Sequence, residues 1–133
     1  MKKRLLSILL ILVLAGAVYY MTPKYFGRGV EPASVDHIQV FDGNTGNGFT
    51  IDDPEDIEYI VNNVKSQKMK RDGISIGHMG YLFQVSYVDS KDKDIIPLFI
   101  INGDNTVRKD PFFYRCDGGL CVDYLKKIEN GER

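Results

Sequence analysis

The stretch from Leu5 to Met21 is seventeen residues long and almost unbroken in its apolar character, with Ser7 as its polar exception. As a helix it would cover about 25 Å, at the lower edge of what spans a hydrocarbon core of about 30 Å. Three basic residues precede it, and Tyr19 and Tyr20 lie at its far end, where aromatic rings favour the headgroup layer. The pattern predicts a single-pass signal anchor within residues 1–22, with the N-terminus cytoplasmic and the remainder extracellular.

Two other interpretations stay open. Ala15-Gly16-Ala17 follows the apolar run as a small-x-small motif, so a signal peptidase would be able to cleave near Ala17 and release a secreted domain. A buried helix of a soluble protein is the third reading, although such helices usually have a polar face. Both the signal anchor and the cleaved signal peptide would export the rest of the chain.

Residues 23–33 are rich in proline and glycine, which predicts a linker, and residues 34–133 are enough for one domain. Three of the 17 Lys and Arg residues precede Leu5, which leaves 14 against 18 Asp and Glu, a net charge of about −4. An acidic domain is a poor match for the phosphates of nucleic acid, so we expect no nucleic-acid partner.

The pattern after the linker alternates between strand and helix signals. Residues 35–41 and 81–88 are typical of strands, as are residues 95–101, where Pro97 indicates an edge or a bulge. Shorter extended segments are expected at residues 49–51, 106–108 and 112–114. Helices are predicted over residues 54–66, with an apolar stripe at helical spacing, and over residues 121–130. The sequence therefore predicts an α+β fold, an antiparallel sheet of about four to five strands covered by two helices in the order strand, helix, strands, helix.

No combination of residues indicates catalysis. The only histidines are His37 and His78, and neither is accompanied by a nucleophile and an acid at a recognisable spacing. Ser34 and Asp36 are sequence neighbours of His37, but strand alternation would send Asp36 and His37 to opposite faces. We therefore expect no catalytic residue and no cofactor, and the protein is not expected to be an enzyme; a cryptic hydrolase is the remaining alternative.

The acidic residues Asp52, Asp53, Glu55 and Asp56 are best explained as the capped start of a helix. A calcium loop starting at Asp42 would use Asn44 and Asp53, but Gly46 and Asn47 occupy the fifth and sixth places, where an EF-hand has a ligand and a glycine. No metal site is expected. The basic run Lys65, Lys68, Lys70 and Arg71 suits a solvated helix end, and an anionic lipid or wall polymer is its alternative partner.

Two further groups of residues are candidates for a structural or binding role. Cys116 and Cys121 are separated by four residues, and outside the cytoplasm the pair would either form a disulfide or remain as two free thiols. Phe112, Phe113 and Tyr114 cannot all point inward on a strand, so they form either part of the core or a contact patch.

The layout resembles a class of small exported, uncharacterised domains of Gram-positive bacteria. The matching features are Ile51-Asp52-Asp53-Pro54 before a helix, the alternating strand at residues 81–88, the turn Ile100-Ile101-Asn102-Gly103 and the closing Val122-Asp123-Tyr124-Leu125. Without a lipid-attachment cysteine, the resemblance implies a single-pass membrane protein. It implies no catalytic residues. Together these patterns predict a membrane-tethered binding or interaction domain for an unknown envelope protein or ligand, or alternatively an inhibitor or immunity-type protein acting on an exported enzyme.

Overall fold

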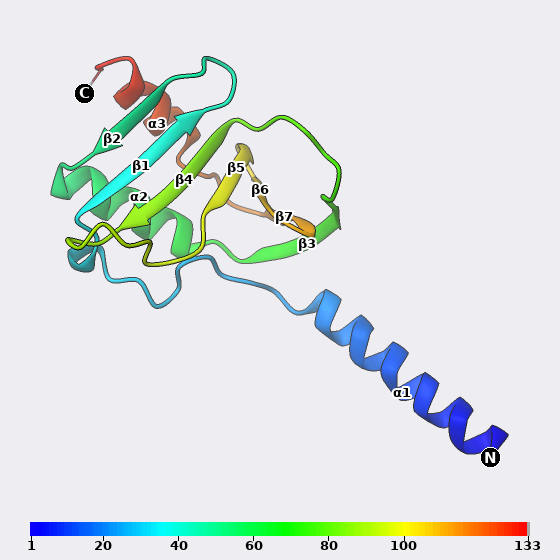
Figure 1. Ribbon diagram of the computed structural model, residues 1–133. Coiled ribbons are helices and arrows are strands. Elements are labelled where there is room, and N and C mark those ends of the chain that lie inside the picture. The colour runs from blue at the N-terminus through cyan, green and yellow to red at the C-terminus, as the bar shows by residue number, and fades with distance from the viewer. Residues whose placement is uncertain (133) are drawn as a thin grey trace.

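The computed structural model describes residues 1–132. Its first element is α1 (Lys2–Met21), a helix that projects away from the rest of the molecule (Figure 1). None of its residues is buried. At 20 residues it is about 30 Å long, which matches the hydrocarbon thickness of a bilayer. The chain therefore has an N-terminal helix long and apolar enough to cross a membrane.

A seven-stranded antiparallel sheet forms the centre of the domain. Its strands are β1 (His37–Asp42), β2 (Gly48–Ile51), β3 (Met69–Ile74), β4 (Phe83–Val88), β5 (Phe99–Gly103), β6 (Thr106–Lys109) and β7 (Phe112–Cys116). Their order in the sheet is β2-β1-β4-β5-β6-β7-β3, so β2 and β3 lie at the two edges. The α+β class is confirmed, whereas the expected count of four to five strands and the expected order are wrong.

The main omission in the expected order is β3. Its sequence, Met69 to Ile74, is polar apart from its two ends and reads as the basic end of the preceding helix. Pairing with β7 makes it a strand, because Met69 lies opposite Cys116 and Lys70 opposite Arg115. The strand expected over residues 95–101 also begins later, at Phe99, after Pro97 in an irregular segment.

Between β2 and β3 the chain forms α2 (Pro54–Ser66). Asp53 caps this helix, since its side chain accepts hydrogen bonds from the backbone N–H groups of Glu55 and Asp56 at 2.9 and 3.3 Å. The helix buries one apolar stripe at helical spacing: Ile57, Ile60, Val61 and Val64. This stripe packs into a single core together with the inward side chains of the sheet.

The last helix, α3 (Val122–Glu129), covers the same face of the sheet as α2 (Figure 1). Val122 and Leu125 extend from it into the core. The two helices also touch each other, with the rings of Tyr59 and Tyr124 stacked at 4.2 Å between centroids. Two helices on one face explain why the buried side chains form one continuous core.

Residues 22–34 follow the surface of this domain rather than standing clear of it. Lys24 and Met69 exchange two backbone hydrogen bonds, 2.7 and 2.8 Å long, along the outer side of β3. Phe26 and Val30 are buried in the core, and Lys65 donates to the carbonyl of Val30 at 3.1 Å. The short 3-10 helix η1 (Pro32–Ser34) then leads into β1. The segment expected as a linker thus contributes to the packing of the domain.

Candidate functional site

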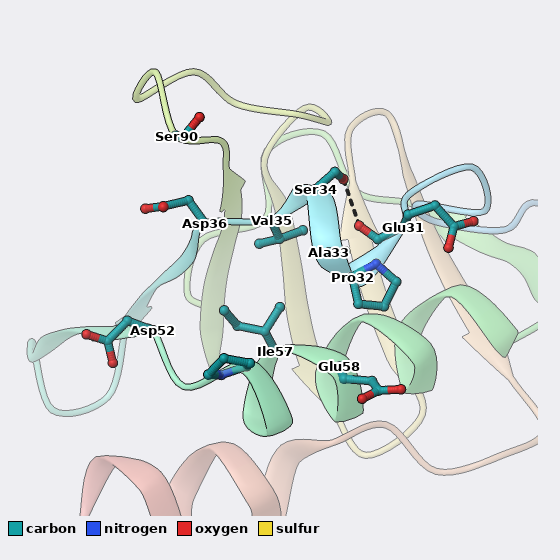
Figure 2. A pocket seen from close by; sticks show the side chains of 11 residues that line it. Glu31, Pro32, Ala33, Ser34, Val35, Asp36, Asp52, Ile57, Glu58 and Ser90 are labelled. Carbon is teal, nitrogen blue, oxygen red and sulfur yellow. Dashed lines mark hydrogen bonds between the residues drawn. The ribbon is translucent and has the colours of Figure 1, made fainter.

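A groove of about 700 Å³ lies where η1 and the residues after it face the first turns of α2 (Figure 2). Its floor is apolar, with Val35 from the η1 side and Ile57 from α2 both nearly buried. Ser90, from the loop after β4, closes one end. The groove is therefore built by three segments that the folding of the sheet brings together.

Four carboxylates surround this floor: Glu31, Asp36, Asp52 and Glu58 (Figure 2). None of the eleven lining residues, all within the described chain, is Lys or Arg. An anionic rim around a small apolar floor favours ligands that combine positive charge with an apolar part. We call this feature the acidic groove.

Of the residues considered for a catalytic triad, Ser34 and Asp36 line this groove and His37 does not, and the three form no triad. Asp36 Oδ2 is 2.8 Å from His37 Nδ1, and Gln39 Nε2 is 3.3 Å from His37 Nε2. The expectation that Asp36 and His37 point to opposite faces is wrong, because β1 begins only at His37 and strand alternation does not reach Asp36. Ser34 donates instead to the carbonyl of Glu31 at 2.7 Å, and no hydrogen bond joins it to His37 in the described chain.

The second histidine, His78, lies far along the sequence in the loop between β3 and β4. Its ring contacts Phe113 edge to face, with 5.0 Å between ring centroids. It is not among the residues that line the acidic groove. His78 thus contacts Phe113 of β7, whereas His37 contacts Asp36 and Gln39.

The acidic cluster at the start of α2 has structural partners. Besides the Asp53 cap, Asp56 accepts a hydrogen bond from the Tyr124 hydroxyl at 2.6 Å, which joins α2 to α3. This hydrogen bond raises the pKa of Tyr124 to about 12. Asp52, by contrast, is exposed at the rim of the acidic groove. Of the acidic residues at the start of α2, namely Asp52, Asp53, Glu55 and Asp56, only Asp52 lines the acidic groove.

The loop compared with a calcium site is held by its own backbone contacts. The buried carboxylate of Asp42 accepts from the N–H groups of Asn44 and Thr45 at 2.6 and 3.1 Å. Asp53, the other carboxylate of that comparison, caps α2. Among residues 1–132, no group of three or more His, Cys, Asp or Glu side chains is placed to hold a metal ion.

Cys116 and Cys121 are both buried and carry free thiols in the structure. Cys116, at the end of β7, donates from Sγ to the carbonyl of Gly118 at 3.0 Å. Burial raises the pKa of both thiols, that of Cys121 to about 12. Oxidation of the pair to a disulfide stays a prediction.

The three aromatic residues of β7 are divided between two faces of the sheet. Tyr114 is buried, and its ring meets Phe26 edge to face at 5.2 Å between centroids. Phe112 lies on the same side, half-buried, 5.7 Å from the ring of Tyr20 at the end of α1. Phe113 faces the other way, toward His78. The structure therefore brings Phe112 and Tyr114 together and separates Phe113 from them.

Arg71 of β3 forms the junction between the apolar helix and the domain. Its Nη1 donates to the backbone carbonyls of Tyr19 and Thr22 at 2.8 and 2.9 Å. Its guanidinium also lies over the rings of Tyr19 and Phe112, 4.3 and 5.2 Å from their centroids. The sequence placed Arg71 only in a basic run, and no local pattern indicates that it meets the end of α1, 52 positions earlier.

Comparison of the chain with protein-family models, with curated proteins and with solved structures gave no match. The functional assignment therefore rests on the geometry of α1, its junction with Arg71 and the acidic groove.

Proposed function

We propose that this protein is a single-pass membrane protein whose domain, residues 34–133, lies outside the cytoplasm and acts by binding a partner rather than by catalysis. The observation that carries the proposal is α1, whose apolar side chains are all exposed over a length of about 30 Å. In water such a surface is costly, whereas in a bilayer it is solvated by lipid.

The orientation follows from the charges that flank α1. Lys2, Lys3 and Arg4 form its first turn and favour the cytoplasmic side. Ala15 to Ala17, the motif of the cleavage alternative, lie inside the continuous helix, and Tyr19 beyond them is held by Arg71. These contacts support a retained anchor over a released domain.

The acidic groove is the surface on which we place the partner. Its four carboxylates and apolar floor suit a basic segment of an envelope protein, with lysine or arginine heads at the rim and an apolar side chain on Val35 and Ile57. The same charge supports a second candidate function, an inhibitor or immunity-type protein that covers a basic surface of an exported enzyme.

Fractionation of cells that express the tagged full chain tests the tether. We expect the protein to stay with membranes after alkaline carbonate washing, and the domain to be cleaved by protease added outside intact spheroplasts. The mass of the membrane-bound protein should include residues 1–17. A soluble product that begins after Ala17 would exclude the anchor in favour of secretion.

Binding of an oligolysine peptide, with and without one apolar residue, tests the groove. We expect binding by the full chain in detergent that weakens as salt rises, because the attraction is between exposed charges. Glu58→Gln should weaken it, whereas Glu132→Gln, which removes one exposed charge outside the groove, should not. Equal effects of the two variants would contradict the assignment. Inhibition of an enzyme captured from envelope extracts would favour the inhibitor function.

A further inference from the structure

The end of β3 and the loop that follows it, residues 74–82, expose three large apolar side chains; this segment is called the β3–β4 loop. Ile74 is 65% exposed, Ile76 68% and Met79 96%, and Met79 is the most exposed large hydrophobic side chain of the described residues after α1. Residues 73–81 contain no Asp, Glu, Lys or Arg. An exposed apolar and uncharged loop of this kind marks a contact surface.

The exposure of these side chains is imposed by the fold. Ser75, between the two isoleucines, is buried, and its N–H donates to the carbonyl of Pro111 at 2.8 Å. Its hydroxyl donates to Asp110. Ser75 is thus buried, whereas Ile74 and Ile76 on either side of it are exposed. A polar residue thus occupies the inner position and the apolar ones the outer positions, the reverse of the usual arrangement at a water-facing surface.

The tip of the loop is also held in place. Arg108 of β6 donates from Nη1 to the carbonyls of His78 and Gly80, both at 3.1 Å. His78 N–H donates to the carbonyl of Ser75 at 3.1 Å, which closes a turn through Gly77 at a φ of 83°. Met79 therefore projects from a loop that is tied down on both sides.

The loop begins beside the outer end of α1. The N–H of Gly73 donates to the phenolic oxygen of Tyr20 at 3.2 Å, and Ile74 lies opposite Phe112, whose ring meets that of Tyr20. Ile76 is three residues beyond Gly73, at most about 10 Å along the chain. Each headgroup layer of a bilayer is about 5–8 Å thick. The apolar side chains are therefore within reach of the layer in which Tyr20 lies when α1 spans the membrane.

We propose that the β3–β4 loop is a second membrane contact, in which Ile74, Ile76 and Met79 enter the boundary between headgroups and acyl chains of the bilayer that α1 crosses. This inference rests on the proposed membrane anchor. The occupant is lipid because the patch is continuous with the aromatic end of α1 and residues 73–81 contribute no Asp, Glu, Lys or Arg side chain. Bound at both α1 and the loop, the domain has one fixed face toward the membrane.

The chain has no tryptophan, so single-tryptophan variants report on one position at a time. The full chain is reconstituted in phosphatidylcholine vesicles with or without bromine on the acyl chains, which quenches nearby tryptophan. Met79→Trp and Ile76→Trp report on the loop, Val13→Trp on the anchor, and Tyr59→Trp on α2, where the half-exposed ring of Tyr59 contacts Tyr124 of α3.

We expect strong quenching and a blue-shifted emission for Val13→Trp, and clear quenching for Met79→Trp and Ile76→Trp, whereas Tyr59→Trp should lose no intensity. Quenching at Val13 without quenching at Met79 and Ile76 would overturn the loop contact and leave the anchor intact. Quenching at none of these positions would overturn both. Met79→Trp replaces an almost fully exposed side chain, so its folding should match that of the parent chain.

Discussion

Arg71 donates a hydrogen bond from Nη1 to the backbone carbonyl of Tyr19 at 2.8 Å, across 52 positions of the sequence. The last carbonyls of a helix have no partner within the helix, and a cation at that end also interacts favourably with the helix dipole. Tyr19 adds its ring face to the same guanidinium. The side chain of Arg71 thus joins α1 to β3, the edge strand of the sheet.

Arg71→Ala should lower the free energy of unfolding of the full chain by about 1–3 kcal/mol, because hydrogen bonds from a charged donor are lost at the helix end. Denaturant unfolding in detergent measures this. Arg71→Lys should recover only part of the loss, since an ammonium lacks the planar fork. Arg115→Ala is the control, because Arg115 forms an exposed pair with Asp72 and should cost less than about 1 kcal/mol.

Ile60→Ala should be among the most destabilising changes in the domain. Ile60 is completely buried between α2 and the sheet, and its truncation leaves a cavity that costs about 2–5 kcal/mol. Thermal or denaturant unfolding checks the value. Asn62→Ala, at an exposed position of the same helix, should change the stability by less than about 0.5 kcal/mol.

Asp53→Ala should cost about 0.5–2 kcal/mol, because the N-terminal N–H groups of α2 lose their acceptor. Asp53→Asn should restore most of this stability, because an asparagine side chain also caps. Asp52→Ala, one residue earlier and exposed, is expected to leave the stability almost unchanged. A larger effect at Asp52 than at Asp53 would mean that the cluster has a role other than capping.

The stability of the reduced protein should fall as the pH rises above about 9. A cysteine thiol ordinarily has a pKa of 9.0, and burial raises the pKa of Cys121 in the folded protein to about 12, because it disfavours the thiolate. Between these values the unfolded chain binds fewer protons than the native one, so the free energy of unfolding decreases with pH. Tyr124 shifts in the same direction, to about 12.

Cys121→Ala removes the contribution of the Cys121 thiol and keeps that of the Tyr124 hydroxyl. It should therefore reduce the slope of stability against pH without abolishing it. The thiol should also react slowly with a thiol-specific reagent at pH 8 until the protein is unfolded, since the thiolate is the reactive form. Fast modification of Cys121 in the native state would contradict its burial.

The sequence allowed the local features of the fold to be predicted where one signal was strong. The α2 helix follows from Pro54, the acidic first turn and the stripe of Ile57, Ile60, Val61 and Val64, and its bounds match the expectation. The α+β class followed from the change between helical and strand periodicity. The apolar exposure of α1 was likewise expected from its composition.

The remaining features depend on contacts between residues that lie far apart in the sequence. The strand β3 has few apolar residues, and its conformation comes from pairing with β7, whose residues lie 38 to 47 positions later in the chain. The acidic groove combines Glu31, Asp52 and Ser90, which no local pattern connects. The role of Arg71 needs the end of α1 next to β3, and the exposure of Ile74 and Ile76 needs the inward Ser75.

The position of β3 at the sheet edge, next to β7, determines when the domain can be completed. Residues 69–74 pair with residues 112–116, so this edge forms only after residue 116 has been synthesised. Pairings between distant segments are the slow steps of folding. Until then Met69 and Arg71 have only Lys24 and the end of α1 as partners. The edge nearest the apolar helix is therefore the last part of the sheet to assemble, and a truncated chain that lacks β7 would leave it open.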